Sequence, residues 1–474
     1  MKIDYPVKDI IRRARHGAQS IYPSFADQEK FSIFGASHLG PSKRFLTLDD
    51  LFLLPPQYTP LRLQKSIELV YREPYFRDVD TTQTLGGFKT PFPLVQASMG
   101  SPEDWNKVSK HSAAVCGKNS LIMGIGENVA TSWGYKERKR RTQPSFKERI
   151  LTYFENETLG IGGVVIQQNE EDAFFELWNK IYSDPDFDQF IQEGRIAFEI
   201  KGGQGAKAGI GGERFVDRQT ALDLKDHYII FPDPEEVEVE KYERHSSPDI
   251  FTEEILANRI KKLKNDYPRV RVWLKTAGFR DLPSVLLNAD NSGIDSIVVD
   301  SKDGGTGMAP SVALQDLGLT SLACLGKIRQ VKSQLKHSSV ILSGRLHTGS
   351  HLAKSLCLGV DGIAMGRPFL ISAYSYRFMD RIFQHELYRK PVLKRIGKLL
   401  YRINSKSEKY IANFITSIKL ETQLLISSLG KYYLHELNSD DLGTENQHLS
   451  QTFGIQNILE SNFGLEEKTI EFMK

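Results

Sequence analysis

Two lysines occupy positions at which a parallel α/β protein places its chemistry. Lys207 lies within Gly202–Glu213, the segment of the chain that is richest in glycine, and Lys275 ends the apolar run Val270–Lys275. A lysine in a loop that follows a strand is suited to hold an anionic ligand. A lysine at the end of a buried strand either snorkels to solvent or points its charge into the site. We expect Lys207 and Lys275 to be the catalytic lysines, and for Lys275 the snorkelling alternative stays open.

Two glycine–arginine pairs predict a phosphate site. Gly344-Arg345 and Gly366-Arg367 each follow a short apolar run directly. Glycine at a strand end lets backbone amides approach a phosphate closely, and the N-terminus of a following helix adds favourable partial charge. In (β/α)8 barrels the loops after the last two strands often build such a site. A plain turn explains either glycine alone, whereas two pairs at consecutive strand ends favour phosphate binding with both arginines as charged contacts.

A third glycine-rich loop, Asp303–Gly307, follows the apolar run Ser296–Asp300, just as the Lys207 loop follows Ile196–Ile200. A flexible linker is the plain interpretation of each loop. Their position directly after a strand favours binding loops instead. We expect Asp303–Gly307 to lie at the mouth of a barrel.

Short apolar runs that alternate with helical segments must position these residues. Such alternation is typical of βα units and a parallel sheet. The number of runs favours an α/β fold with a closed (β/α)8 TIM barrel, and an open doubly wound sheet is the alternative. The runs are 94–98, 163–167, 196–200, 270–275, 296–300, 340–343 and 362–365.

Changes in pattern divide the chain into three parts. We expect an irregular N-terminal cap over residues 1–90, the barrel over 91–380 and a helical C-terminal extension over 381–474. In the extension, Tyr410–Leu429 carries apolar residues at helical spacing and Gly430 is suited to end the helix. A tail packed on the barrel is the plain interpretation of that helix, and a dimerisation element is the alternative.

Composition narrows the class of protein. The chain has 474 residues and a net charge of +3, which gives no footprint of nucleic-acid binding. It has three cysteines, far apart in the sequence, so we expect no disulfide framework and no metal site built from local cysteines. We find no signal-peptide pattern and no apolar run of membrane-spanning length, and we therefore expect a cytoplasmic protein without a membrane partner.

Six motifs, in order from about Pro91 to Phe378, resemble those of the FMN-binding synthase domain of glutamate synthase. Residues 204–212 are similar to that family's GQGAKPGEGGQ, and residues 303–307, followed by Pro310, match its HDGGTGASP. The others are 97–100 (SGMSFG in the family), the strand ending in Lys275 (VKLV), 343–349 (DGGLKTG) and 366–368 (GTAP). Residues 412–442 also resemble the tail of short, stand-alone members.

The resemblance implies a barrel that carries FMN and delivers hydride to 2-iminoglutarate, formed from 2-oxoglutarate and ammonia, to give L-glutamate. Lys275 would lie at the flavin N1–C2 carbonyl edge. Gln204, Lys207 and Glu213 would bind the small-molecule anionic substrate, with Lys207 facing its carboxylate. The residues that would hold FMN are Ala97, Ser98, Met99, Gln167, Lys275, Asp303, Gly304, Gly305, Gly344, Arg345, Gly366 and Arg367.

The chain departs from the family in its substrate loop. Ala208, Ile210 and Glu213 stand in place of the family's proline, glutamate and final glutamine, and Lys302 replaces its histidine. Glu213 puts an anion beside an anionic substrate, which is unfavourable unless a cation compensates for it. The family's cysteine cluster is also absent after the last strand.

These departures leave the reaction open. Our first hypothesis is an FMN-dependent oxidoreductase that acts at a carbon bearing nitrogen or oxygen next to a carboxylate, with 2-oxoglutarate and glutamate as one candidate pair. The alternatives are a catalytically silent flavin-binding scaffold subunit and a phosphate-binding barrel enzyme without flavin. No G-x-G-x-x-G motif opens a βαβ unit, so we expect electrons to come from a reduced carrier or from an electron-donor or ammonia-supplying partner protein. Residues 1–90 are too few for a glutaminase domain, so we expect that this chain alone is not a complete glutamine-dependent glutamate synthase.

Overall fold

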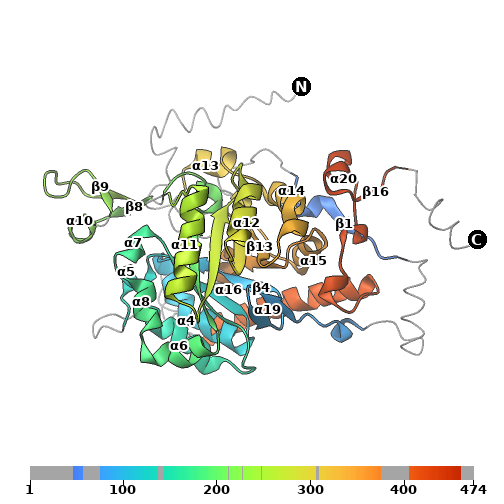
Figure 1. The fold of residues 1–474 in the computed structure, drawn as a ribbon, viewed down its shortest axis with the longest axis horizontal. Coiled ribbons are helices and arrows are strands. Elements are labelled where there is room, and N and C mark those ends of the chain that lie inside the picture. The colour runs from blue at the N-terminus through green and yellow to red at the C-terminus, as the bar shows by residue number, and fades with distance from the viewer. Residues whose placement is uncertain are drawn as a thin grey trace, which may run out of the picture.

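The computed structural model describes residues 46–56, 75–136, 144–211, 213–226, 228–246, 248–305, 309–374 and 405–460. At the centre of this part of the chain, eight parallel strands close a barrel (Figure 1). In the order in which they pair, they are β4 (Leu94–Met99), β5 (Ile122–Ile125), β6 (Gly163–Gln168), β7 (Ile196–Gly202), β11 (Arg271–Ala277), β12 (Ser296–Asp300), β13 (Ser339–Ser343) and β14 (Gly362–Met365). The expected α/β TIM barrel is confirmed.

The strand β5 was not among the expected apolar runs. Its run is short and is interrupted by Gly124. A Cβ at Gly124 would lie 2.5 Å from Oγ of Ser98, so the close approach of β4 and β5 requires glycine there. Gly124 therefore allows β4 and β5 to pair, and it also interrupts the apolar run by which β5 could have been recognised in the sequence.

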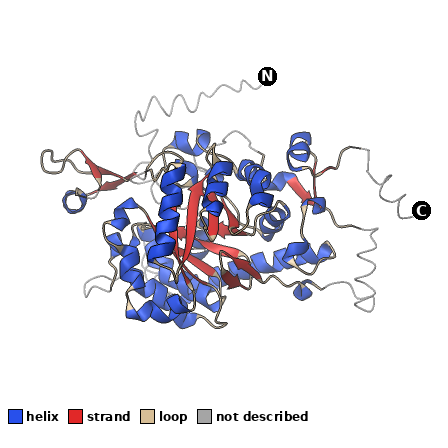
Figure 2. Ribbon diagram, viewed as in Figure 1, coloured by secondary structure: helices blue, strands red, loops and turns tan. Residues whose placement is uncertain are grey.

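Helices surround the barrel and bury their apolar faces on it (Figure 2). In α11, for example, Leu256, Ile260 and Leu263 are buried at helical spacing, and Thr252 caps the first turn by accepting from the N–H of Ile255. The longer helices are α4 (Glu103–Lys118), α6 (Phe146–Asn156), α11 (Glu253–Asp266), α12 (Leu282–Asn291), α14 (Ser321–Val331), α15 (Gly349–Cys357) and α19 (Ser405–Ser428). The shorter ones are α5 (Val129–Trp133), α7 (Glu170–Ala173), α8 (Leu177–Tyr182), α9 (Asp188–Gln192), α13 (Ser311–Asp316) and α16 (Arg367–Ala373).

A hairpin from the expected cap closes the bottom of the barrel. It consists of β2 (Gln83–Leu85) and β3 (Phe88–Thr90), and it places Leu85 and Phe88 in the apolar cluster inside the barrel. The indole N–H of Trp273 donates to the carbonyl of Gly86 at 3.1 Å, which fixes the turn of the hairpin. This part of residues 1–90 therefore plugs the barrel and does not wrap around it.

The C-terminal extension completes the ring of helices. The expected helix is present as α19, it packs against α4, α15 and α16, and Gly430 after it has a φ of +71°. The extension also contains the short strands β15 (Leu442–Thr444) and β16 (Gln456–Asn457) and the helix α20 (Gln447–Phe453). The N-terminal strand β1 (Leu51–Leu53) pairs with β15 in antiparallel register, so the two ends of the described chain share one small sheet.

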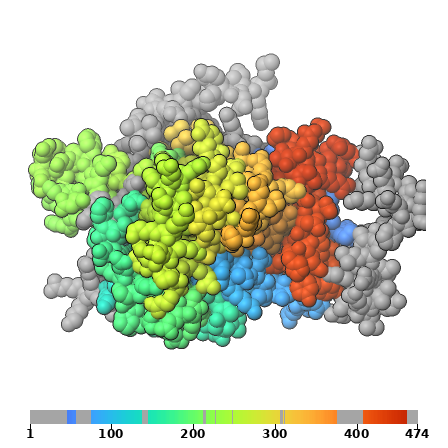
Figure 3. Space-filling model, viewed as in Figure 1, coloured from blue at the N-terminus to red at the C-terminus, as the bar shows by residue number. Residues whose placement is uncertain are grey.

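A small antiparallel sheet stands out from the barrel between β7 and α11. It is made of β8 (Glu213–Val216), β10 (Tyr242–His245) and β9 (Ile229–Phe231), with α10 (Arg218–Leu224) beside them. Figure 3 shows this arm in light green as a lobe beside the body of the molecule. Single 3₁₀ turns occur at η4 (Leu48–Asp50), η5 (Phe76–Asp78), η6 (Pro185–Phe187), η7 (Gly205–Lys207), η8 (Lys302–Gly304), η9 (Lys332–Gln334), η10 (Leu434–Glu436) and η11 (Ser439–Asp441).

The described residues contain neither a membrane-spanning helix nor a cluster of potential metal ligands. None of their helices combines the length and the apolar character needed to span a membrane. Within the same ranges, no group of three or more histidine, cysteine, aspartate or glutamate residues is arranged to hold a metal ion.

The crossing of α15 and α19 predicts a specific sensitivity to a methyl group. A Cβ on Gly349 would lie 2.6 Å from the carbonyl of Ile418 and 2.6 Å from the N–H nitrogen of Thr422, both of which belong to the backbone of α19. We therefore expect Gly349→Ala to lower the free energy of unfolding by about 1–3 kcal/mol in urea denaturation. Gly326→Ala on α14 is the control: its Cβ would meet nothing closer than 3.7 Å, and alanine should add up to about 1 kcal/mol of stability there. Equal stability of the two variants would contradict the close crossing.

Candidate active site at the mouth of the barrel

The interior of the barrel has an apolar layer below and a more polar layer above. Alternate side chains of a strand point inward, so residues two apart share the interior. The lower layer is Val95, Ile122, Val165, Ala197, Trp273, Val298, Ile341 and Ala364. Two positions further along the same strands, towards their carboxyl ends, the upper layer is Ala97, Gly124, Gln167, Glu199, Lys275, Asp300, Ser343 and Gly366. Active sites of such barrels form at this end.

Gln167 and Glu199 form a polar pair in the upper layer. Nε2 of Gln167 donates to Oε1 of Glu199 at 2.7 Å, and Ser98 also hydrogen-bonds that carboxyl group. Burial raises the pKa of Glu199 above its ordinary value, although Lys275 and these hydrogen bonds oppose the shift. Oε1 of Gln167 is fully buried and has no hydrogen-bond partner among the described residues. The pair therefore presents an unsatisfied acceptor next to a carboxyl group whose pKa is raised by burial.

Lys275 points into the barrel. Its residue is 8% exposed, and Nζ lies 3.4 Å from the carbonyl oxygen of Ser98 on β4. On the neighbouring strand, Lys275 is in register with Lys201. The structure thus favours the inward orientation over snorkelling to solvent.

A buried and a largely buried carboxylate balance the lysines at the mouth. Nζ of Lys201 lies 2.6 Å from Oδ2 of Asp249 and 4.0 Å from Oε1 of Glu127. Burial opposes ionisation of Glu127, but the positive charges of Lys201, Lys275 and Lys207 outweigh it and hold the pKa of Glu127 below its ordinary value. Glu127 is therefore an anion within reach of three cations.

The predicted substrate loop is held in place by the barrel. Nε2 of Gln204 donates to Oε1 of Glu127 at 2.6 Å, and the N–H of Gly205 donates to Oδ2 of Asp300 at 3.1 Å. A Cβ at Gly205 would lie 2.0 Å from the carbonyl of Ser301, so only glycine fits there. Lys207, which ends the turn η7, is 5% exposed. Gly205 therefore serves close packing, and the flexible-linker interpretation does not describe this part of the loop.

Asp300 joins this loop to the rest of the mouth. Its Oδ2 receives the N–H of Gly205, and its Oδ1 accepts from Oγ of Ser343 at 2.9 Å. One carboxylate at the end of β12 thus fixes both the Lys207 loop and the end of β13.

The predicted phosphate residues lie together on the opposite side of the mouth. Nη2 of Arg367 lies 3.5 Å from the carbonyl of Asp303, and a Cβ at Gly305 would be 3.0 Å from the same nitrogen. Burial lowers the pKa of Arg367, and Asp300 opposes that shift. Arg345 is exposed and has a φ of +55°.

The glycines on this side serve different purposes. A Cβ on Gly344 would lie 1.8 Å from Oγ of Ser301, and a Cβ on Gly304 would lie 3.2 Å from Cα of Gly344, so close packing explains both. At Gly366, by contrast, a Cβ would only reach ordinary contact with Met99 at 3.4 Å and with Ala97 at 3.7 Å. No described neighbour requires glycine at position 366.

The structure leaves out the side chain of one predicted residue and part of one predicted loop. Glu213 starts β8 opposite His245, and its side chain is not among the described ones. Residues 306–308 of the third glycine-rich loop are likewise outside the described ranges. The role of Glu213 stays a prediction.

Five charged residues of the mouth were not expected from the sequence, and one of them is Asp249, which lies in no expected element. Glu199 and Lys201 stand two apart in the otherwise apolar run of β7, and this spacing is the signal that could have placed them on one face. Glu127 was missed together with β5. Asp300 ends an expected strand, where it was considered only as part of the run.

Comparison with known proteins gives one family. Residues 188–432 match the family described as the conserved region in glutamate synthase. The glutamate synthase large subunit-like protein of Rhizobium meliloti (strain 1021) is 26% identical over 274 residues, which are 52% of this chain and 58% of that protein. The archaeal glutamate synthase (NADPH) of Methanocaldococcus jannaschii is 28% identical over 189 residues, which are 39% and 36%. This chain therefore matches between 36% and 58% of the length of these two relatives.

Solved structures share the fold. A mutant flavocytochrome b2 with sulfite bound covers 97% of this chain and 95% of its own, with a TM-score of 0.52 at 15% identity. Another mutant, with benzoylformate, covers 92% and 91%, with a TM-score of 0.51 at 14% identity. At this identity the likeness concerns the fold alone.

Opposite pKa shifts of the two buried glutamates predict opposite pH effects on stability. Because the pKa of folded Glu199 is raised above the usual 4.5, the folded protein keeps a proton that the unfolded chain loses, and stability falls as the pH rises from 4.5 through the folded pKa. Glu199→Gln has no carboxyl group to ionise and so does not lose this stability. The difference in melting temperature between the variant and the wild type should therefore shift in favour of the variant as the pH rises above 4.5. Ionised Glu127 stabilises the fold, because its pKa is lowered. This stabilisation is complete above pH 4.5 and is lost as the pH falls below it, so Glu127→Gln should have a lower melting temperature than the wild type at neutral pH. Calorimetry over a pH series checks both, and a constant difference for Glu199→Gln would refute the raised pKa.

Proposed function

The chain belongs to the family defined by the conserved region in glutamate synthase, and from that premise we propose that it is an FMN-dependent oxidoreductase. The reaction is hydride transfer at a carbon that bears nitrogen or oxygen and lies next to a carboxylate. The observation that carries the proposal is the upper layer of the barrel, where Lys275 and the unsatisfied acceptor of Gln167 face the interior above an apolar floor.

The described residues of the mouth fit a flavin. Oε1 of Gln167 is a buried acceptor that needs a donor, and the polar edge of a flavin ring supplies one. Gly366 lacks a side chain although the protein leaves room for one, which suits the close approach of a ligand. Arg367 supplies a cation for a phosphate group on the same side of the mouth. Ring and phosphate ends of FMN would thus both find suitable groups.

Bound FMN supplies the hydride chemistry, and the protein supplies charge and orientation. Lys275 would hold its positive charge where negative charge develops on the ring during reduction. Burial raises the pKa of Glu199, so its carboxyl group keeps its proton to a higher pH than an exposed glutamate does. At a given pH, less negative charge then opposes the cation of Lys275.

The substrate would be an anionic amino, imino or oxo acid. Lys207 offers a cation for its carboxylate, and Glu127 offers an anion for an amino or imino nitrogen. Gln204 holds Glu127 in place, so both charges are fixed before the substrate arrives. The pair 2-oxoglutarate and glutamate is the first candidate, since Lys207 lies in the loop that resembles the family's substrate loop.

Electrons, and ammonia for an oxo-acid substrate, would come from a reduced carrier or a partner protein. No G-x-G-x-x-G motif opens a βαβ unit in the sequence, so a nicotinamide site within this chain has no support. An electron-donor or ammonia-supplying partner is therefore part of the proposal.

The proposal is tested by reconstituting the purified protein with FMN and recording its visible spectrum with a panel of amino and oxo acids. Glutamate or another amino acid should bleach the bound flavin, and the matching oxo acid with ammonia should reoxidise the reduced form. Lys207→Met should lower the second-order rate constant for reduction of the flavin by the substrate roughly a hundredfold, because the substitution removes a buried positive charge that would pair with the substrate carboxylate. Lys262→Met, which changes a lysine on α11 that is 73% exposed, should leave it unchanged. A flavin that is inert to every acid would refute the reaction, and a protein that binds no flavin would refute the cofactor.

The phosphate end of the site has its own test. Arg367→Gln removes a charge-assisted contact worth about 1.5–3 kcal/mol, so we expect FMN to bind roughly 10- to 100-fold more weakly. Riboflavin, which lacks the phosphate, should bind the variant and the wild type equally well. Fluorescence quenching of the two flavins measures both affinities. Equal losses for FMN and riboflavin would place Arg367 away from the phosphate.

A further inference from the structure

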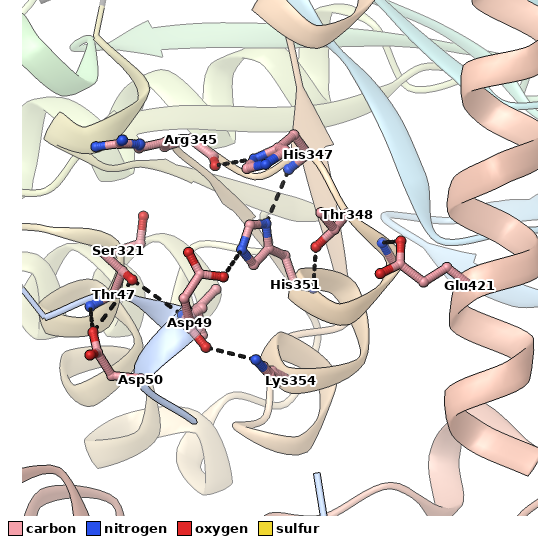
Figure 4. A network of polar contacts seen from close by, with 12 residues as sticks. Thr47, Asp49, Asp50, Ser321, Arg345, His347, Thr348, His351, Lys354 and Glu421 are labelled. Atoms are coloured by element: carbon pink, nitrogen blue, oxygen red, sulfur yellow. Dashed lines mark hydrogen bonds and ion pairs between the residues drawn. The ribbon is translucent and has the colours of Figure 1, made fainter. Parts of the chain in front are cut away.

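His351 on α15 joins the loop after β13 to the N-terminal segment around η4. Figure 4 shows its ring between His347 and Asp49. Nδ1 accepts the backbone N–H of His347 at 3.2 Å, and Nε2 lies 3.0 Å from Oδ1 of Asp49. The residue is 4% exposed. Two segments from opposite ends of the sequence thus meet on one buried imidazole.

The partners of His351 determine where its proton sits. A backbone N–H can only donate, so Nδ1 must carry a lone pair, and the single ring proton lies on Nε2, which donates to Asp49. Protonation would place an N–H on Nδ1 opposite the N–H of His347, and that hydrogen bond would be lost. Only the neutral ring satisfies both contacts.

Burial of the imidazole favours the neutral ring of His351. Burial lowers the pKa of His351, His347 and Lys354 act in the same direction, and Asp49 opposes them. Nζ of Lys354 is itself bound to the carbonyl of Leu48 at 3.0 Å. The other charged groups on the elements packed against α15 include Asp50, which bonds the N–H of Thr47, Glu421, which accepts the N–H of Gly349, and Asp441, which pairs with Lys431.

The loop that His351 holds is the one that carries Arg345. It is fixed at its start by Ser321, whose Oγ donates to the carbonyl of Gly344 at 2.9 Å. Its far end is fixed by the bond from His347 to His351. Between them, Arg345 has a left-handed backbone with a φ of +55°, and its side chain points away from both histidines (Figure 4). A non-glycine residue in that conformation persists only where its surroundings hold it.

We propose that neutral His351 is a positioning residue for this loop, and that its protonation releases the loop and weakens the binding of the phosphate end of FMN. The idea rests on the proposed function for the identity of the ligand. It adds a coupling between pH, the segment around Asp49 and the affinity for the cofactor. Arg345 and the amides of the loop are the groups through which His351 acts.

Two substitutions separate the two contacts of the ring. In His351→Asn the side-chain oxygen takes the place of Nδ1, so the contact to His347 is kept and no longer titrates. In His351→Gln the side-chain nitrogen takes the place of Nε2, so the contact to Asp49 is kept and the contact to the loop is lost. Melting temperatures show whether both variants fold.

The experiment measures FMN affinity by fluorescence quenching from about pH 8 down to about pH 4.5, because burial moves the protonation of His351 below the ordinary range of histidine. Ionisation of the FMN phosphate changes the affinity of the wild type and of His351→Asn alike. The wild type should lose about tenfold more FMN affinity towards acid pH than His351→Asn, because only the wild type also loses the contact to His347. His351→Gln should bind FMN roughly tenfold more weakly at every pH, and riboflavin should show none of these differences. Identical pH profiles for the wild type and His351→Asn would overturn the role of His351.

Failure of the proposed function gives a different result. If the wild type binds no FMN at neutral pH, the cofactor assignment is wrong, whatever the variants do. Amide hydrogen exchange at His347, which needs no ligand, then decides the remaining point. It should be faster in His351→Gln than in His351→Asn at neutral pH, and equal rates would refute the hold on the loop.

Discussion

Side chains of a barrel strand can point only inward or outward, and this alternation decides where the chemistry of the molecule lies. Each residue of the apolar floor is followed, two positions later on the same strand, by a residue of the upper layer. The floor needs a plug, which Leu85 and Phe88 provide from a hairpin outside the barrel. The upper layer can then be polar, because the apolar core is complete beneath it. Lys275 and Glu199 face the mouth for that reason, since each stands two residues after a buried floor residue.

Burying lysines imposes a second requirement, because an isolated charge in the interior is costly and must be paired. The mouth meets it with carboxylates from different segments: Glu127 follows β5, and Asp249 lies between the arm and α11. The pKa shifts of the two glutamates have opposite signs, since the pKa of Glu127 is lowered while that of Glu199 is raised. The result is a site with localised charges of both signs, in which the positive charge of Lys275 is only partly balanced by the neighbouring carboxyl groups. Such an arrangement is suited to an anionic ligand that also carries an amino or imino group.

Local patterns predicted the barrel because seven of its strands are continuous apolar runs, and they predicted Lys207 and Lys275 because both follow or end such runs. The patterns failed where a residue's role depends on a strand next to it in space. Gly124 is explained only by Ser98 on the neighbouring strand, and without β5 the adjacent Glu127 had no place in the site. The hairpin that plugs the barrel was expected as part of a wrapping cap. Nothing in the sequence of the hairpin shows that its turn is held by a hydrogen bond from the indole of Trp273, which is 187 residues away.

The sheet shared by β1 and β15 has a consequence for the order in which the molecule is made. Oγ1 of Thr444 donates to the carbonyl of Asp50, a residue 394 positions earlier in the chain. At a synthesis rate of about 5–20 residues per second, roughly 20–80 s pass between the translation of these two residues. Throughout that time β1 lacks the strand with which it pairs. The strand that directly follows η4, the turn that contains Asp49, can therefore complete its sheet only after β15 has been made.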